Sequence, residues 1–153
     1  MVRIGGLGTM KKLVICSGYF NPIHRGHVDY LTQAKSLGDS LFVIVNSDQQ
    51  VQIKGSKPFM GEEERVYIVN ALHCVDDSMI SIDADGSVCD SIRDIHGRYS
   101  LFYDIVFANG GDRKDDNIPE YKLCEELDIE MVFSVGGGKT QSSSDLIKGV
   151  LHG

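Results

Sequence analysis

The chain has 153 residues, of which 42% are hydrophobic and 24% charged, with a formal net charge of −7. This length is sufficient for one domain with a full core. An acidic chain without a basic tract argues against nucleic acid or an anionic membrane as the main partner, and no apolar stretch approaches the ~18 residues of a membrane span. The four cysteines form no CxxC pair, so we expect buried free thiols and a reducing, cytoplasmic compartment.

Residues 1–9 precede the first predicted strand and lack the long apolar core of a signal peptide. We expect them to form an N-terminal extension, either as a disordered arm or as sequence upstream of a natural start at Met10. Residues 10–153 are expected to form a single domain, because no repeat, low-complexity tract or linker divides them.

Short apolar runs predict five strands, over Leu13–Ser17, Ser40–Asn46, Met79–Ile82, Asp104–Ala108 and Glu130–Val135. Apolar residues at helical spacing predict helices between and after them, over Val28–Leu37, Glu62–Leu72, Val88–Ile95, Pro119–Leu127 and Ser143–Leu151. The segment Asn46–Pro58 is predicted as a loop. This alternation with short connections predicts an α/β fold in which a doubly wound, five-stranded parallel sheet carries helices on both faces.

Ligands of doubly wound folds bind at the carboxyl ends of the strands. Glycine-rich or polar loops leave those ends at four places, over Gly18–His27, Asn46–Pro58, Asn109–Arg113 and Gly136–Ser144. The sequence therefore predicts a single site at this edge of the sheet.

The run Gly18-Tyr-Phe-Asn-Pro-Ile-His-Arg-Gly-His27 places two histidines where a strand becomes a helix. The free N–H groups and the dipole of a helix N-terminus favour an anion, and a phosphate is the obvious candidate. Two alternatives remain at this point. The pair could cap or pack, or it could be half of a metal site, although no other cysteine or histidine pair has the spacing to complete a zinc shell.

The same run resembles the GxFNPxHxGH signature of the HxGH nucleotidylyltransferase superfamily, and further landmarks follow in family order. Val45-Asn-Ser-Asp48, Lys54-Gly55 and Lys57-Pro58 are similar to a segment of heptose 1-phosphate adenylyltransferases. Glu64-Arg65, Gly110-Gly-Asp112 and Ser142-Ser-Ser-Asp145 extend the resemblance. Glycerol-3-phosphate cytidylyltransferases share most of these landmarks. The resemblance implies the Rossmann-like fold of these enzymes and a homodimer.

The resemblance also implies a reaction. Such enzymes join a phosphorylated small molecule to an NTP, ATP or CTP, and release pyrophosphate without a covalent enzyme intermediate. Mg²⁺ would bridge the NTP phosphates, with no metal ligand expected from the protein itself. His24, His27 and Lys54 are the expected catalytic residues, because the transition state needs donors and cations held in place.

Nucleotide binding is expected from Gly18, Tyr19, Phe20, His24, His27, Gly111, Asp112, Ser142, Ser143 and Ser144. Lys57 and Arg113 are expected to contact the acceptor. Asn21 stands where the sugar- and polyol-phosphate branches commonly carry aspartate. This difference leaves the identity of the acceptor open. A sugar- or polyol-phosphate adenylyltransferase is the main expectation. A cytidylyltransferase making a CDP-alcohol, such as CDP-glycerol, and a non-catalytic nucleotide sensor are the alternatives.

Overall fold

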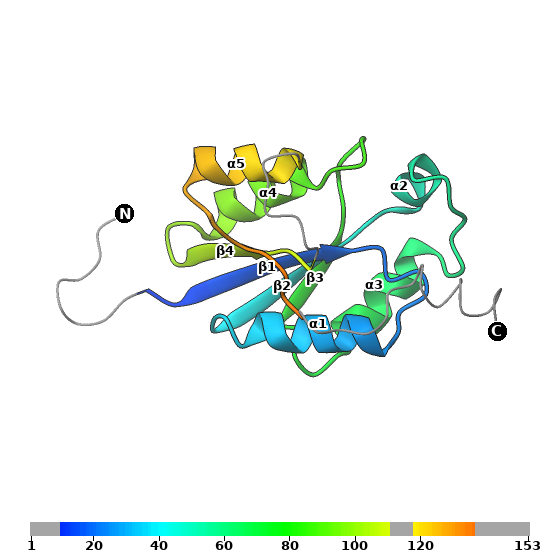
Figure 1. Ribbon diagram of the computed structural model, residues 1–153, viewed down its shortest axis with the longest axis horizontal. Helices are drawn as coiled ribbons and strands as arrows, with labels where there is room; N and C mark the ends of the chain where they lie inside the picture. Colours follow the sequence, from blue (N-terminus) through cyan, green and yellow to red (C-terminus); the bar gives the residue numbers. More distant parts are fainter. Residues whose placement is uncertain (1–9, 111–117, 137–153) are drawn as a thin grey trace.

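The computed structural model describes residues 10–110 and 118–136, which form a parallel sheet between two helical layers (Figure 1). The order across the sheet is β3-β2-β1-β4-β5. The strands are β1 (Lys12–Gly18), β2 (Ser40–Val45), β3 (Asp77–Ile80), β4 (Asp104–Ala108) and β5 (Glu130–Val132). All five predicted strands are confirmed, although β5 ends three residues earlier than the apolar run suggests.

Helices cover both faces of the sheet, as predicted (Figure 1). One layer holds α1 (Arg25–Lys35) and α3 (Glu62–Asn70), and the other holds α4 (Cys89–Tyr99) and α5 (Pro119–Leu127). Each connection returns the chain to a parallel strand. The doubly wound α/β prediction is confirmed.

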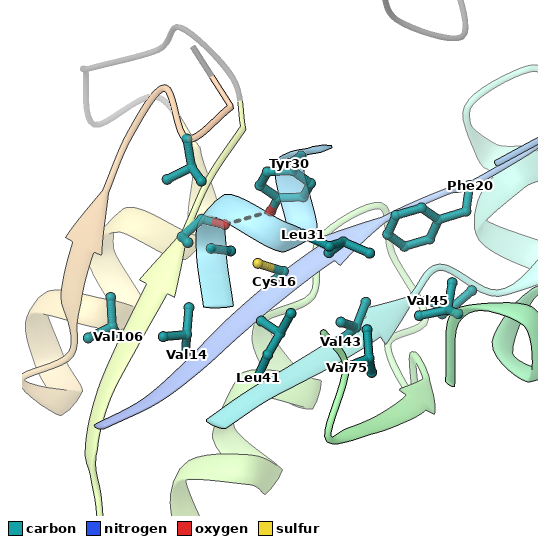
Figure 2. Packing of buried hydrophobic residues seen from close by; sticks show 14 residues of the cluster. Val14, Cys16, Phe20, Tyr30, Leu31, Leu41, Val43, Val45, Val75 and Val106 are labelled. Carbon is teal, nitrogen blue, oxygen red and sulfur yellow. Dashed lines mark hydrogen bonds between the residues drawn. The ribbon is translucent and has the colours of Figure 1, made fainter. Parts of the chain in front are cut away.

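The core has two layers, because successive side chains of each strand point to opposite faces of the sheet. Along β1, Val14 and Cys16 pack beneath α1, whereas Leu13 and Ile15 pack beneath α4 and α5. All four are buried, because a parallel sheet covered on both faces has no solvent side. Figure 2 shows the first of these layers.

The segment after β2 differs from its prediction. Residues 48–53 form a short helix, α2 (Asp48–Ile53), and the predicted loop is confined to the residues that follow it. The Ser47 hydroxyl accepts from the Gln50 amide at 3.1 Å, and the Ser47 amide donates to the Gln50 side-chain oxygen at 3.0 Å. This reciprocal cap satisfies N–H groups that a helix start would otherwise leave unpaired.

Tyr30 of α1 fastens the carboxyl end of β4 to the helical layer. Its hydroxyl donates to the carbonyl oxygen of Ala108 at 2.7 Å, the dashed line of Figure 2. A Cβ on Gly110 would lie 3.2 Å from the Tyr30 ring, and a Cβ on Gly136 would lie 3.2 Å from the Tyr30 Cα. The loops that follow β4 and β5 therefore both pass closely over one turn of α1.

The predicted extension at 1–9 and the predicted helix Ser143–Leu151 lie outside the described residues. Within residues 10–110 and 118–136, none of the helices has the length and apolar character needed to cross a membrane.

Candidate functional site

The site begins where β1 ends. From β1 the chain winds outward through α1 to β2 and β3, and it later returns across the opposite face to β4. β1 and β4 are therefore neighbours whose connections leave on different sides, which opens a crevice at their carboxyl ends. Gly18 ends β1 at this point, and Tyr19 and Phe20 follow it.

Gly18 and Phe20 are packed against each other. A Cβ on Gly18 would lie 2.7 Å from Phe20 Cζ, so the ring occupies the space that glycine leaves. Phe20 is 1% exposed and its φ is +50°, which turns the backbone sharply between strand and helix. Gly18 thus has a packing role beside the nucleotide-binding role predicted from the sequence.

His24 and His27 cap the start of α1 reciprocally. His24 is the N-cap residue, and its Nδ1 accepts from the Gly26 amide at 3.0 Å. His27 Nδ1 accepts from the His24 amide at 3.1 Å. Because each Nδ1 is an acceptor, each neutral ring carries its proton on Nε2. The capping alternative is therefore correct for the Nδ1 atoms, while both Nε2–H groups remain donors.

The two rings form a compact aromatic group with Phe20. The His24 and His27 centroids lie 3.9 Å apart with planes tilted by 35°, and the Phe20 ring meets His27 edge to face at 5.1 Å. Neighbouring rings and a shared cap hold both imidazoles at the positive end of α1. Two N–H donors beside a helix N-terminus can hydrogen-bond an oxyanion as charge develops on it.

The segment after α2 brings two lysines to this turn. The Lys54 ammonium lies 4.3 Å from the centre of the Tyr19 ring, a cation–π contact. Lys57 is exposed, and its carbonyl accepts from the Asn21 side-chain amide at 2.9 Å. Both predicted lysines therefore belong to a segment that contacts the Gly18–His27 turn.

Tyr19 remains a neutral phenol at the edge of the site. Partial burial raises the pKa of its hydroxyl, and the charge of Glu120 raises it further. Glu120 lies in the first turn of α5, where its carboxylate also accepts from the Val88 amide at 3.0 Å. The start of α5 is thus within electrostatic reach of the β1 exit.

Arg65 of α3 is a site residue whose role the sequence reasoning missed, since it served there only as a family landmark. Its side chain is fully buried and ion-paired with Asp48 at 2.7 Å. The guanidinium also donates to the carbonyl oxygens of Tyr19 at 2.8 Å, Asn46 at 2.7 Å and Met60 at 2.9 Å. One cation therefore joins the exits of β1 and β2 to the segment before α3.

The buried side-chain amide of Gln50 ties the end of β2 to the loop before α4. Gln50 is 0% exposed, and its Nε2 donates to the carbonyl oxygens of Asp85 and Ser87, each at 2.8 Å. Its Oε1 accepts from Asn46 at 3.0 Å. These hydrogen bonds hold the carboxyl end of β2 against the loop before α4.

The remaining predicted site residues lie outside the described residues. They are Gly111, Asp112, Arg113, Ser142, Ser143 and Ser144. Among residues 10–110 and 118–136, no group of three or more histidine, cysteine or acidic side chains is arranged to hold a metal ion.

Comparison with known proteins agrees with this geometry. The family model described as cytidylyltransferase-like matches residues 15–146, a range that begins within β1 and includes β2 to β5 and the histidine pair. The chain belongs to this family. The predicted resemblance to this family is confirmed.

Curated relatives include proteins of two names. Bifunctional proteins named HldE are 48% identical over 142 residues in Geotalea uraniireducens and 33% identical over 146 residues in Pelobacter propionicus. An FAD synthase of Methanosarcina acetivorans is 44% identical over 78 residues, covering 51% of each chain. The two HldE matches cover 90% and 93% of this chain but only 27% and 28% of the relatives. The chain therefore spans less than a third of those proteins.

A solved structure shares the fold. The crystal structure of a lipopolysaccharide core biosynthesis protein from Thermoplasma volcanium superposes with a TM-score of 0.65 at 25% identity. The match covers 80% of this chain and 95% of that one.

Proposed function

We propose that this domain transfers a nucleoside monophosphate from an NTP to a phosphorylated sugar or polyol and releases pyrophosphate. The adenylyltransferase of the ADP-heptose synthase type is the form we favour. The observation that carries the proposal is the reciprocal cap of His24 and His27, which directs both ring protons onto Nε2 at a helix N-terminus.

The chemistry fits this arrangement. An oxygen of the acceptor phosphate attacks the α-phosphorus in line, a new P–O bond forms, and the bond to the β-phosphate oxygen breaks. The electron pair of that bond leaves with pyrophosphate. Charge grows on the α-phosphate and leaving-group oxygens, where one well-placed donor contributes about 3–4 kcal/mol by analogy with oxyanion holes. His24 and His27 would supply two such donors, with no protein nucleophile needed.

The surrounding residues take the supporting roles in this proposal. Lys54, held over Tyr19, and Lys57 would neutralise the β- and γ-phosphates or the acceptor phosphate. The backbone at Phe20 would approach the α-phosphate. Outside the described residues, Gly111 and Asp112 would bind the nucleotide ribose, Ser142, Ser143 and Ser144 its phosphates, and Arg113 the acceptor.

Mg²⁺ belongs to the proposal as a companion of the nucleotide. The described donors near the histidines are imidazole N–H, ammonium and amide groups, which suit phosphate oxygens rather than a hard cation. The ion would therefore be held chiefly by the NTP phosphates and water, and it would neutralise charge on the pyrophosphate that leaves.

Cytidylyl transfer is the competing form, since the chain belongs to a cytidylyltransferase-like family and its landmarks also fit CDP-alcohol synthesis. Similarity to HldE proteins over most of the chain supports the adenylyl form. A nucleotide sensor without turnover would not need two ring donors at one helix start.

A substrate panel separates these possibilities. The purified domain, Mg²⁺ and each NTP in turn would be combined with sugar 1-phosphates, glycerol 3-phosphate and other alcohol phosphates, and pyrophosphate release measured. We expect release with ATP and a sugar or polyol phosphate. Release with CTP alone would contradict the adenylyl form, and nucleotide binding without release from any pair would favour the sensor.

Location and assembly complete the proposal. The four cysteines are free thiols, which supports a reducing, cytoplasmic compartment. The partners of the protein would be the NTP and the phosphorylated acceptor, rather than nucleic acid or a membrane. A homodimer is proposed from the family resemblance, and light scattering on the purified chain would test it.

A further inference from the structure

The side chain of Asn21 joins the first turn to the lysine-bearing segment. Its Nδ2 donates to the carbonyl oxygen of Lys57 at 2.9 Å, and its Oδ1 accepts from the amide of Phe59 at 2.6 Å. One primary amide therefore uses both a donor and an acceptor to hold backbone groups two residues apart. These two hydrogen bonds are long-range: Lys57 lies 36 positions after Asn21 in the sequence, and Phe59 lies 38 positions after it.

Two other contacts bind the same pieces of chain. Lys54 lies over the Tyr19 ring at 4.3 Å, and Arg65 donates to the carbonyl oxygens of both Tyr19 and Met60. The segment 54–60 is thus fastened to the β1 exit near its start, middle and end. Only the middle link depends on Asn21.

The amides of Lys54, Gly55 and Ser56 donate to carbonyl groups of α2, so the start of the segment is held there, and the Asn21 link holds the residues that follow. Residues 54–57 are all exposed, and a Cβ on Gly55, whose φ is +89°, would meet no atom within 4 Å. Exposed loops with few packing contacts are mobile unless hydrogen bonds hold them. The position of the Lys57 backbone therefore depends strongly on the Asn21 amide.

We propose that Asn21 is a positioning residue that holds the segment 54–60 against the histidine cap, so that its lysines meet the substrate phosphates. The proposal rests on the proposed function for the identity of those phosphates. It also assigns a reason for asparagine at this position, where related enzymes commonly carry aspartate.

Aspartate cannot make the same link at neutral pH. A carboxylate has acceptors only, so it can accept from the Phe59 amide but must turn a lone pair toward the Lys57 carbonyl. That contact is repulsive, and it leaves the carbonyl without its donor. The amide is therefore the chemical requirement of the link, and polarity alone does not satisfy it.

The first test needs no activity. Hydrogen exchange of the Phe59 amide would be measured by NMR in the wild type, Asn21→Asp and Asn21→Ala, with Asn70→Asp as the matched control. Asn70 is exposed at the end of α3, and its Oδ1 accepts from the Ser78 hydroxyl, a role a carboxylate keeps. We expect exchange at Phe59 to be at least ~10-fold faster in Asn21→Ala, which loses both bonds, and to be less accelerated in Asn21→Asp, which keeps the acceptor for the Phe59 amide and loses only the bond to Lys57.

The second test measures phosphate binding and turnover. Inorganic tripolyphosphate is the probe for binding, and we expect its affinity to fall by ~10-fold in Asn21→Ala, which removes the link without adding a charge, and to be unchanged in Asn70→Ala. In turnover, KM for the NTP should rise more than kcat falls. The ratio of Asn21→Asp to wild-type kcat/KM should recover as pH falls toward 4, because a protonated carboxyl regains a donor for Lys57.

The outcomes separate this inference from the proposed function. Wild-type exchange at Phe59 in Asn21→Ala would overturn the link itself. Faster exchange with unchanged tripolyphosphate affinity would overturn its positioning role. If the wild type released no pyrophosphate, the proposed function would fail, yet a ~10-fold loss of tripolyphosphate affinity in Asn21→Ala would still support the role of the link at a phosphate site.

Discussion

The Phe20 ring lies where a side chain on Gly18 would have to go, 2.7 Å from an ideal Cβ at that position. Gly18→Ala therefore displaces the Phe20 ring from its buried position and from its edge-to-face contact with His27. Overpacking of this kind costs about 1–3 kcal/mol. We expect Gly18→Ala to lower the free energy of unfolding by that amount, measured by urea denaturation, and to reduce turnover through the displaced histidine.

Gly97 of α4 provides the matched control. A Cβ there would meet no atom within 4 Å, so alanine fits without strain. Gly97→Ala should raise stability by about 0.5–1 kcal/mol, because alanine restricts the unfolded chain and favours helix. Equal effects of the two substitutions would show that the contact between Gly18 and Phe20 is unimportant.

A second prediction concerns Arg65. Arg65→Met keeps a long apolar stem but removes the partner of Asp48 and the donors to three carbonyl groups. Removing one member of a buried, hydrogen-bonded pair costs about 3–5 kcal/mol. We expect a loss of this size in urea denaturation. Arg98→Met, which breaks a half-exposed pair with Asp94 at 3.1 Å, should cost less than about 1 kcal/mol.

Stability should also depend on the charge of Asp76. Burial alone would raise the pKa of this carboxyl, but a hydrogen bond from Lys35, one from the Leu41 amide and the Lys35 charge outweigh it and lower the pKa. A depressed native pKa means that the stabilisation is complete above the unfolded value of about 3.9 and is lost as pH falls through the native value.

Asp76→Asn reveals this contribution. Its urea midpoint should lie below that of the wild type at pH 7, and the gap should close below about pH 4. Asp94→Asn, on the exposed face of α4, supplies a comparison for a surface ion pair. A gap for Asp76→Asn that persists at pH 3 would assign the effect to packing instead of charge.

Sequence patterns predict the sheet well. Runs such as Leu41–Val45 are apolar on both faces, which is typical of a strand inside a parallel sheet that helices cover on both sides. They did not predict α2. Its signal, a serine three residues before a glutamine, is short and lies within polar sequence. The position of Lys57 relative to Asn21 was also out of reach, because contacts between loops depend on the fold that joins them.

The burial of Arg65 illustrates the same limit. It stands four residues before Val69 on the inward face of α3, which was a usable hint. Arginine is rarely fully buried, so the pattern alone favoured a solvated side chain. The carbonyl groups that receive its hydrogen bonds come from three separate loops, which only the folded chain brings together.

The histidine pair carries the mechanism. His27→Ala removes one ring donor and should lower kcat by at least ~100-fold. It also removes one half of the α1 cap, at a cost of about 1 kcal/mol in stability. His73→Ala alters an exposed histidine at the opposite edge of the sheet and should leave kcat unchanged. Normal turnover by His27→Ala would exclude this ring from the mechanism.

The central claim is that the α-phosphate is the group transferred. ATP labelled at the α-phosphorus and, separately, at the γ-phosphorus would be incubated with Mg²⁺, a sugar 1-phosphate and the wild-type protein. The account predicts that α-label appears in the sugar nucleotide while γ-label appears in pyrophosphate, at equal rates. Transfer of γ-label to the acceptor, or retention of both labels in ATP with every phosphorylated acceptor tried, would contradict it.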